Sequence, residues 1–283
     1  MTTTTATDPT QHALHCMEVW GGNRPIQSGI SVPGIDAWVL SDPCGNDPGG
    51  GDIYYVSMCG GGRIARFMVA DVSGHGEAVS ELAVKLRTLM RRHVNKLDQT
   101  RLVRSLNRGF ARLGRADKFA TAVLTSYFAP TDHLVICNAG HPPPLWYRAR
   151  TGTWCVLAHE MPERLESSSN LPLGIVHPTS YHQFAVKLEL HDLVLIYTDG
   201  LIEARDQDGN LLEESGLMKI VRSLDATNPN QFCEALLAEV ARFCDQRPFD
   251  DDVTVVLLHH NAADPPPLTL AHRMKMLGKM MRF

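Results

Sequence analysis

Apolar and polar residues alternate along this chain with two different periods, one typical of strands and one typical of helices. Runs rich in Val, Ile and aromatic residues predict strands over Ile53–Met58 and Arg63–Asp71, and the glycine turn between them favours a hairpin. Apolar residues at helical spacing then predict one helix over Glu77–Val94 and a second over Gln99–Leu113. The first part of the chain is therefore expected to place a hairpin ahead of a pair of helices.

The rest of the chain is expected to add more strands, then two helices, and then a last strand. The strands are predicted at Ala120–Phe128, His133–Asn138, Leu145–Tyr147, Thr153–Leu157, Tyr181–Leu188, Leu193–Thr198 and Val253–His259. The helices are predicted at Glu213–Leu224 and from about Asn230 to Gln246, with Pro229 at the first position of the second. This order favours an α+β sandwich of antiparallel sheets flanked by helical pairs. A doubly wound parallel sheet would need regular alternation of strands and helices.

The pattern divides the chain into three segments. Residues 1–34 begin with a Thr-rich stretch and are expected to be disordered or weakly ordered, whereas residues 35–260 carry a continuous pattern. Within that region the polar stretch Ala158–Asn170 is interpreted as an exposed loop. Residues 261–283 are interpreted as a Pro-rich linker and a basic, Met-rich tail. The tail could contact a membrane surface or a partner, but a loosely packed terminal segment is the simpler interpretation.

Composition narrows the class of protein further. With 44% hydrophobic residues, the 283-residue chain can form a sizeable core, and its net charge of −4 gives no reason to expect nucleic acid as a partner. The sequence lacks a signal peptide, and no apolar run approaches the ~20 residues of a membrane span, so a cytoplasmic location is the default. The seven cysteines are an odd number without a Cys-x-x-Cys pair, which argues against a disulfide framework and a zinc site.

Four acidic motifs carry the candidate chemistry. Asp52, Asp71 and Asp199 each lie beside an apolar run, and so does the acidic run Asp250–Asp252. A carboxylate beside a buried strand is costly to desolvate unless it finds a cation or a donor. Taken singly, each Asp could equally be a turn, capping or solvated residue. If the four motifs converge, however, they form an oxygen-rich site of the kind that Mg²⁺ and Mn²⁺ prefer, which indicates metal-assisted hydrolysis.

The motifs, in this order, resemble those of the PPM family of metal-dependent protein serine/threonine phosphatases, the protein phosphatase 2C type. The resemblance covers about residues 35–260 and is closest to the bacterial branch of the sporulation stage II phosphatase E and the sigma-factor regulator phosphatases. Its strongest pieces are Gly51-Asp52, Ala70-Asp71-Val72-Ser73-Gly74-His75-Gly76, Asn138-Ala139-Gly140-His141-Pro142, Tyr197-Thr198-Asp199-Gly200 and Asp251-Asp252-Val253-Thr254. The fold that it implies is an αββα four-layer sandwich.

The resemblance also implies a ligand set for two Mn²⁺ or Mg²⁺ ions. Asp71 would bridge both ions, and the Val72 carbonyl would add a ligand to the first ion. Asp52 would contact this first ion largely through water. Asp199 and Asp251 would hold the second ion, since the family places that ligand at the first Asp of the Asp-Asp-x-Thr motif.

The function implied is hydrolysis of a phosphoserine or phosphothreonine on a regulatory protein by a metal-activated water. The substrate could be an anti-sigma factor antagonist. A catalytically weak binding module of the same fold is the alternative, but a module that only binds has no need of all four Asp. His75 and His141 could act as proton donors, but structural roles are favoured for both. The two helices over residues 77–113 could act as a switch on Asp71. The sequence leaves the oligomeric state open, and a dimer is compatible with it.

Overall fold

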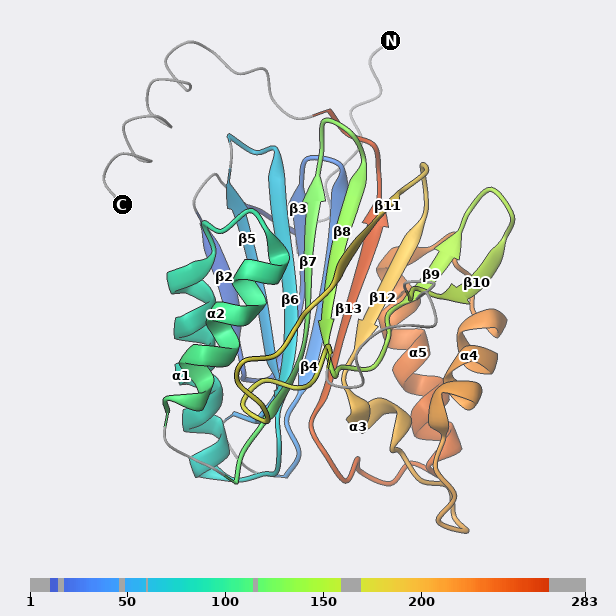
Figure 1. The fold of residues 1–283 in the computed structure, drawn as a ribbon. Coiled ribbons are helices and arrows are strands. Elements are labelled where there is room, and N and C mark those ends of the chain that lie inside the picture. Colours follow the sequence, from blue (N-terminus) through green and yellow to red (C-terminus); the bar gives the residue numbers. More distant parts are fainter. Residues whose placement is uncertain are drawn as a thin grey trace.

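A computed structural model describes residues 11–14, 18–45, 49–59, 61–113, 117–158 and 169–264. In this part of the chain two sheets pack face to face, and helices cover the outer face of each sheet (Figure 1). The six-stranded sheet carries α1 (Glu77–His93) and α2 (Gln99–Ala111). The seven-stranded sheet carries α4 (Glu213–Ser223) and α5 (Pro229–Phe243). The αββα four-layer sandwich expected from the sequence is confirmed.

The strand order interleaves segments that are distant in sequence. The six-stranded sheet has the order β11 (Gln183–Lys187), β8 (His133–Ala139), β7 (Ala120–Phe128), β6 (Ile64–Val72), β5 (Ile53–Cys59) and β2 (Val19–Gly22). The seven-stranded sheet has the order β1 (Gln11–Ala13), β3 (Ile26–Val32), β4 (Ile35–Asp42), β13 (Val253–His260), β12 (Leu193–Tyr197), β9 (Leu145–Arg148) and β10 (Thr153–Val156). All pairings are antiparallel among the named strands except β1 with β3, which is parallel.

Strand β6 illustrates why the sequences of the central strands are nearly continuous apolar runs. Phe67 and Val69 point into the layer between the two sheets, whereas Met68 and Ala70 point toward α1 and α2. Successive side chains of a strand point to opposite faces, so a strand that is covered on both faces needs apolar residues at nearly every position. The helices show the complementary pattern, because only one face of each helix is buried, as at Leu82, Leu86 and Leu89 of α1.

The N-terminal segment differs from the expectation. We predicted that residues 1–34 would be disordered or weakly ordered, but β2 and β3 lie within that range and extend both sheets. β2 pairs with β5, and β3 pairs with β4. The mixed pattern Ile26-Gln27-Ser28-Gly29-Ile30 gave little local signal. Pairing with a neighbouring strand supplies the stabilisation that the segment lacks by itself.

Most of the predicted strands and helices occur with ends shifted by one or a few residues, as is usual for element boundaries. Pro229 occupies the first turn of α5, as predicted. A turn was one alternative for Asp199, but this residue begins a short helix, α3 (Asp199–Ile202). Residues 159–168 of the predicted loop, and the tail from residue 265, lie outside the described residues.

Candidate active site

The two sheets each bring two of the predicted carboxylates to one end of the sandwich. Asp52 immediately precedes β5, and Asp71 lies near the end of β6, where the antiparallel register pairs Ile53 with Ala70. Asp199 follows β12, and Asp251 lies two residues before β13, which pairs with β12 in the other sheet. Antiparallel pairing therefore places the start of one strand beside the end of its neighbour in both sheets. The four residues lie close enough for the charge of Asp71 to interact with those of Asp52, Asp199 and Asp251.

The four carboxylates are linked by their effects on each other's pKa values. Burial raises the pKa of Asp52 well above its usual value, and the negative charge of Asp71 adds to the effect. Burial also raises the pKa of Asp71, followed by the charges of Asp199 and Asp251. The pKa values of Asp199 and Asp251 are raised mainly by burial as well. Like charges in a desolvated site favour the protonated form of each group, and a bound cation would reverse that preference.

Asp52 is the most deeply buried of the four, with 2% of its surface exposed. The Thr198 hydroxyl donates a 2.7 Å hydrogen bond to its Oδ2, and the Thr254 backbone N–H donates to that same hydroxyl oxygen at 2.9 Å. The other carboxylate oxygen, Oδ1, is buried and lacks a hydrogen-bond partner among the described residues. A buried carboxylate oxygen without a donor is costly. A cation or an ordered water on a cation would satisfy it.

The acidic run before β13 separates into three different environments. Asp250 is exposed, and its carboxylate lies 3.8 Å from the Arg205 guanidinium. Asp252 is buried, and its two oxygens accept hydrogen bonds from the Cys44 N–H at 2.7 Å and the Gly51 N–H at 2.6 Å. Asp251 is half-buried and close enough to Asp199 for the two charges to interact. Asp251 and Asp252 both raise the pKa of Asp71, but Asp252 is engaged by two backbone N–H groups, whereas the Asp251 carboxylate accepts only from the Asp252 N–H among the hydrogen bonds of the described residues.

Two glycines allow the loops to close around Asp252. A Cβ atom on Gly50 would lie 2.2 Å from Asp252 Oδ2, and a Cβ on Gly200 would lie 2.2 Å from the Asp252 carbonyl oxygen. Side-chain carbons do not approach oxygen atoms so closely, so a side chain at position 50 would displace the Asp252 carboxylate, and one at position 200 would displace the Asp252 backbone. The Gly-Gly-Asp and Asp-Gly motifs are thus parts of one packing arrangement around Asp252.

The two histidines occupy different environments. His75 lies on the exposed loop between β6 and α1, next to Gly74 and Gly76, whose φ angles are +89° and +95°. His141 is buried, and its Nδ1 lies 2.9 Å from the Thr121 hydroxyl. Burial lowers the pKa of His141 to about 3, although the Tyr197 backbone opposes this effect, so the imidazole is neutral near pH 7. A neutral, enclosed imidazole fits the structural role expected for His141.

Sequence reasoning missed several residues that support the site. Asn23 donates from Nδ2 to the Gly50 carbonyl at 3.1 Å and to the Ser80 hydroxyl at 3.0 Å, and its own carbonyl accepts from Gly50 N–H at 2.8 Å. The Lys118 ammonium donates to the Ser73 carbonyl at 3.0 Å. Neither residue lies in a recognisable motif, and Asn23 lies in the segment predicted to be weakly ordered. Only spatial proximity identifies them.

The donor chemistry fits hard divalent cations such as Mn²⁺ and Mg²⁺, which prefer oxygen ligands and retain several waters. The carboxylates with raised pKa values and the unpartnered Asp52 Oδ1 supply that chemistry. Within the described ranges, no group of three or more His, Cys, Asp or Glu side chains is arranged so that it could hold a metal ion without rearrangement.

Comparison with known proteins identifies the family. Residues 61–261 match the family described as Stage II sporulation protein E (SpoIIE). The chain belongs to this family. The matched SpoIIE region contains Asp71, Asp199 and Asp251, whereas Asp52 precedes it. The resemblance seen in the motifs is therefore confirmed at the level of the family.

Individual relatives of this chain have low sequence identity to it. The chain is 24% identical over 194 residues to the phosphoserine phosphatase RsbU of Bacillus subtilis, an alignment that covers 67% of this chain and 54% of RsbU. This chain thus matches about half the length of that relative. The RsbU and RsbW domains of a Mycobacterium tuberculosis protein share the fold with a TM-score of 0.69 and 24% identity, over 92% of this chain and 70% of theirs.

A further solved structure with this fold is a catalytic domain crystallised with metal. The catalytic domain of the serine threonine protein phosphatase PstP, in complex with two manganese ions, aligns with a TM-score of 0.53 and 15% identity. The alignment covers 80% of this chain and 97% of that domain. At this identity the likeness concerns the fold. Among the described helices of the present chain, none is both long and apolar enough to cross a bilayer.

Proposed function

We propose that this protein is a metal-dependent phosphoprotein phosphatase that hydrolyses a phosphoserine or phosphothreonine monoester on a regulatory protein. The observation that carries the proposal is the convergence of four aspartates from two sheets, with raised pKa values and one unpartnered carboxylate oxygen. Membership of the SpoIIE family and the relative named phosphoserine phosphatase support the reaction class. An anti-sigma factor antagonist is the substrate class that we propose.

In this proposal the residues that would hold two Mn²⁺ or Mg²⁺ ions are Asp71, Asp52, the Val72 carbonyl, Asp199 and Asp251. Asp71 would be shared by both ions, Asp52 and the Val72 carbonyl would serve the first, and Asp199 and Asp251 would serve the second. Bound ions would supply an activated water and neutralise charge on the phosphoryl group. The overall reaction forms a P–O bond from water and breaks the P–O bond to the seryl or threonyl oxygen, which leaves as a hydroxyl.

The chain's own residues hold this arrangement in register. Thr198 fixes the orientation of the Asp52 carboxylate through the 2.7 Å hydrogen bond to Oδ2. Asp252 joins the loop before β5 to the loop before β13. It lies next to β13 of the seven-stranded sheet, and its carboxylate accepts a hydrogen bond from the Gly51 N–H, which precedes β5 of the six-stranded sheet. Preorganised ligands of this kind reduce the reorganisation that accompanies binding and reaction. We therefore assign Thr198 and Asp252 positioning roles rather than contact with substrate.

The test is hydrolysis of p-nitrophenyl phosphate and of a phosphoserine protein with Mn²⁺ or Mg²⁺. Asp71→Asn and Asp199→Asn should each lower kcat by about 100-fold or more, because each removes an anionic ligand from a metal on which the nucleophile depends. Asp250→Asn should keep full activity, since that carboxylate is exposed and faces Arg205. Activity that is equal in all four proteins, or absent from the wild type with every metal, would contradict the proposal and favour the binding-module alternative.

A further inference from the structure

Positive charge is concentrated in one segment of this otherwise acidic chain. Residues 84–118, which include most of α1 and all of α2, contain 11 of the 27 Lys and Arg residues but only 2 of the 31 Asp and Glu residues. The layer that covers the six-stranded sheet is therefore strongly cationic, and the remainder of the molecule is acidic. Such segregation creates a local positive potential to which an anion is attracted.

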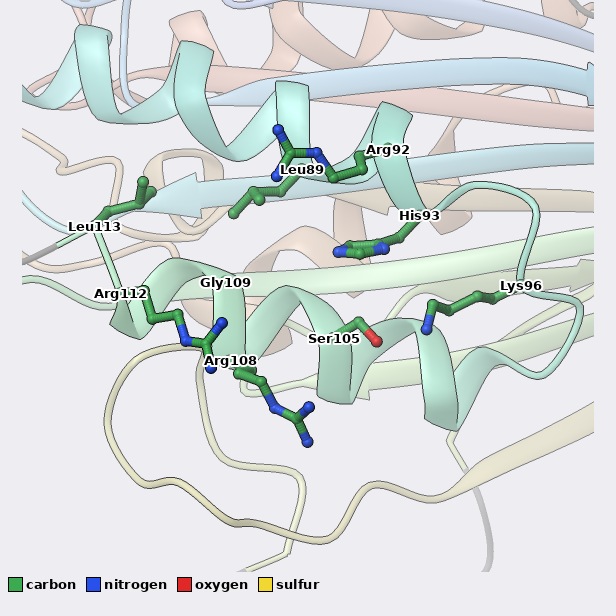
Figure 2. A pocket seen from close by; sticks show the side chains of 9 residues that line it. All are labelled: Leu89, Arg92, His93, Lys96, Ser105, Arg108, Gly109, Arg112 and Leu113. Atoms are coloured by element: carbon green, nitrogen blue, oxygen red, sulfur yellow. The ribbon is translucent and has the colours of Figure 1, made fainter. Parts of the chain in front are cut away.

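Within this layer the groove between α1 and α2 contains a cavity of about 450 Å³ (Figure 2). Four cationic side chains line it, with Arg92 and Lys96 at the end of α1 and beyond it, and Arg108 and Arg112 at the end of α2. The apolar side chains of Leu89 and Leu113 also contribute to the lining. The helices approach closely here, because a Cβ atom on Gly109 would lie 2.9 Å from Leu89 Cδ1.

The cations of this groove lack acidic partners. None of the four forms an ion pair with a described carboxylate, and Arg108 meets only the His177 ring at 3.4 Å. Elsewhere on the surface, Arg101 pairs with Asp98 and Arg150 with Glu189. Four like charges around one cavity repel each other, and an anion bound among them would relieve that repulsion.

We propose that the groove between α1 and α2 binds a nucleotide-type ligand, which carries several phosphate charges and an apolar ring. Three guanidinium groups offer planar donor pairs that match phosphate oxygens, and Lys96 adds a point charge. The volume lies within the ~300–1,000 Å³ of small-molecule pockets, and Leu89 with Leu113 provides apolar surface for a ring. An acidic protein segment or an anionic membrane would not need a concave site with this mixed lining.

The groove lies outside the cluster of catalytic aspartates but is connected to it. The Arg66 side chain of β6 donates to the Lys96 carbonyl at 3.0 Å, and β6 also carries Asp71. Arg66 is 1% exposed, so this link is held within the packed structure. A ligand in the groove would therefore contact the segment that connects α1 to α2. Arg66 joins this segment to β6, the strand that carries Asp71.

The experiment measures binding of ATP by isothermal titration calorimetry in EDTA, so that the metal-free aspartates repel the ligand. The double variant Arg92→Gln/Arg112→Gln should weaken binding by about tenfold or more, because it removes two charge-assisted contacts. The matched control Arg91→Gln/Arg104→Gln removes the same charge from the same helices, at positions that are exposed like Arg92 and Arg112 but do not line the cavity. This control should change the affinity less than about twofold, as expected for a screened surface charge.

Parallel titrations with polyglutamate and with phosphatidylserine vesicles test the other polyanions. The proposal predicts that ATP binds more tightly than either and that only its binding depends on the groove pair. Equal loss in the two double variants overturns the proposal, as does binding of the peptide or the vesicles without binding of ATP. Because binding is measured without metal or turnover, the result does not depend on whether the proposed phosphatase activity is found.

Discussion

At the scale of single residues, the end of the sandwich that holds the four aspartates lowers the stability of the metal-free protein. Asp52 and Asp71 are largely removed from water and lie near other negative charges, which raises the pKa of both carboxyl groups. A group whose pKa is higher in the folded state than in the unfolded state binds more protons when folded. The free energy of unfolding in the absence of metal must then decrease as pH rises from the ordinary Asp value of 3.8 through the raised pKa.

Asp71→Asn should remove part of this electrostatic strain. In EDTA near neutral pH we expect the variant to be more stable than the wild type by on the order of 1 kcal/mol, since one pKa unit corresponds to about 1.4 kcal/mol. Its stability should also decrease less as pH rises above the ordinary Asp value of 3.8. Urea unfolding at several pH values measures both quantities. Asp250→Asn serves as the control and should retain the wild-type pH dependence; an unchanged slope in Asp71→Asn would refute this account.

At the scale of elements, the helices and central strands were predictable because their signal is local. α2 is amphipathic, buries residues such as Leu102, Leu106 and Phe110, and begins after Asp98. β2 and β3 were missed because their stability depends on pairing with β5 and β4. The spacing of apolar residues in an element shows which face is buried. A short strand of mixed polarity forms only when it pairs with another strand, and the local sequence does not show which strand that is.

The start of α2 depends on one side chain. Asp98 Oδ1 accepts hydrogen bonds from the Thr100 N–H at 2.9 Å and the Arg101 N–H at 3.2 Å, so it caps two free donors of the first turn. Asp98→Ala should lower the free energy of unfolding by about 1 kcal/mol. Asp98→Asn should keep most of the stability that Asp98→Ala loses, because Asn caps a helix nearly as well as Asp. Chemical denaturation of both variants distinguishes a capping effect from a general charge effect. If only the charge of Asp98 mattered, Asp98→Asn and Asp98→Ala would lower the free energy of unfolding equally.

At the scale of the whole molecule, the candidate active site depends on contacts between residues far apart in sequence. The four aspartates could be predicted because each lies in a motif beside a strand. The partners of Asp252 could not, since the Gly51 N–H that it accepts from is 201 residues away in the chain. Asn23 supports the Gly50 loop from a segment whose own pattern predicts no structure. Motifs therefore identify the carboxylates, and only the fold identifies what holds them.

Removal of the N-terminal strands should therefore damage the site as well as the sheets. A chain that begins at Ile35 lacks β2 and β3, exposes the edges of β5 and β4, and loses Asn23. We expect it to aggregate, or to unfold at lower temperature and lose Mn²⁺-dependent activity. A chain that begins at Gln11 keeps every described contact and should match the full-length protein. Light scattering, thermal unfolding and phosphatase assays compare the two, and equal behaviour would show that the N-terminal strands are dispensable.

The division of the four aspartates between two sheets also bears on which ion the proposed site would prefer. Asp52 and Asp71 are positioned by one sheet, and Asp199 and Asp251 by the other. The size of the space between them follows from how far apart the sheets lie and how they are offset. Residues of the layer between the sheets, such as Phe67 and Val256, set those dimensions. Discrimination between ions of different radius, such as Mn²⁺ and the smaller Mg²⁺, is then partly a property of apolar side chains that never touch a metal.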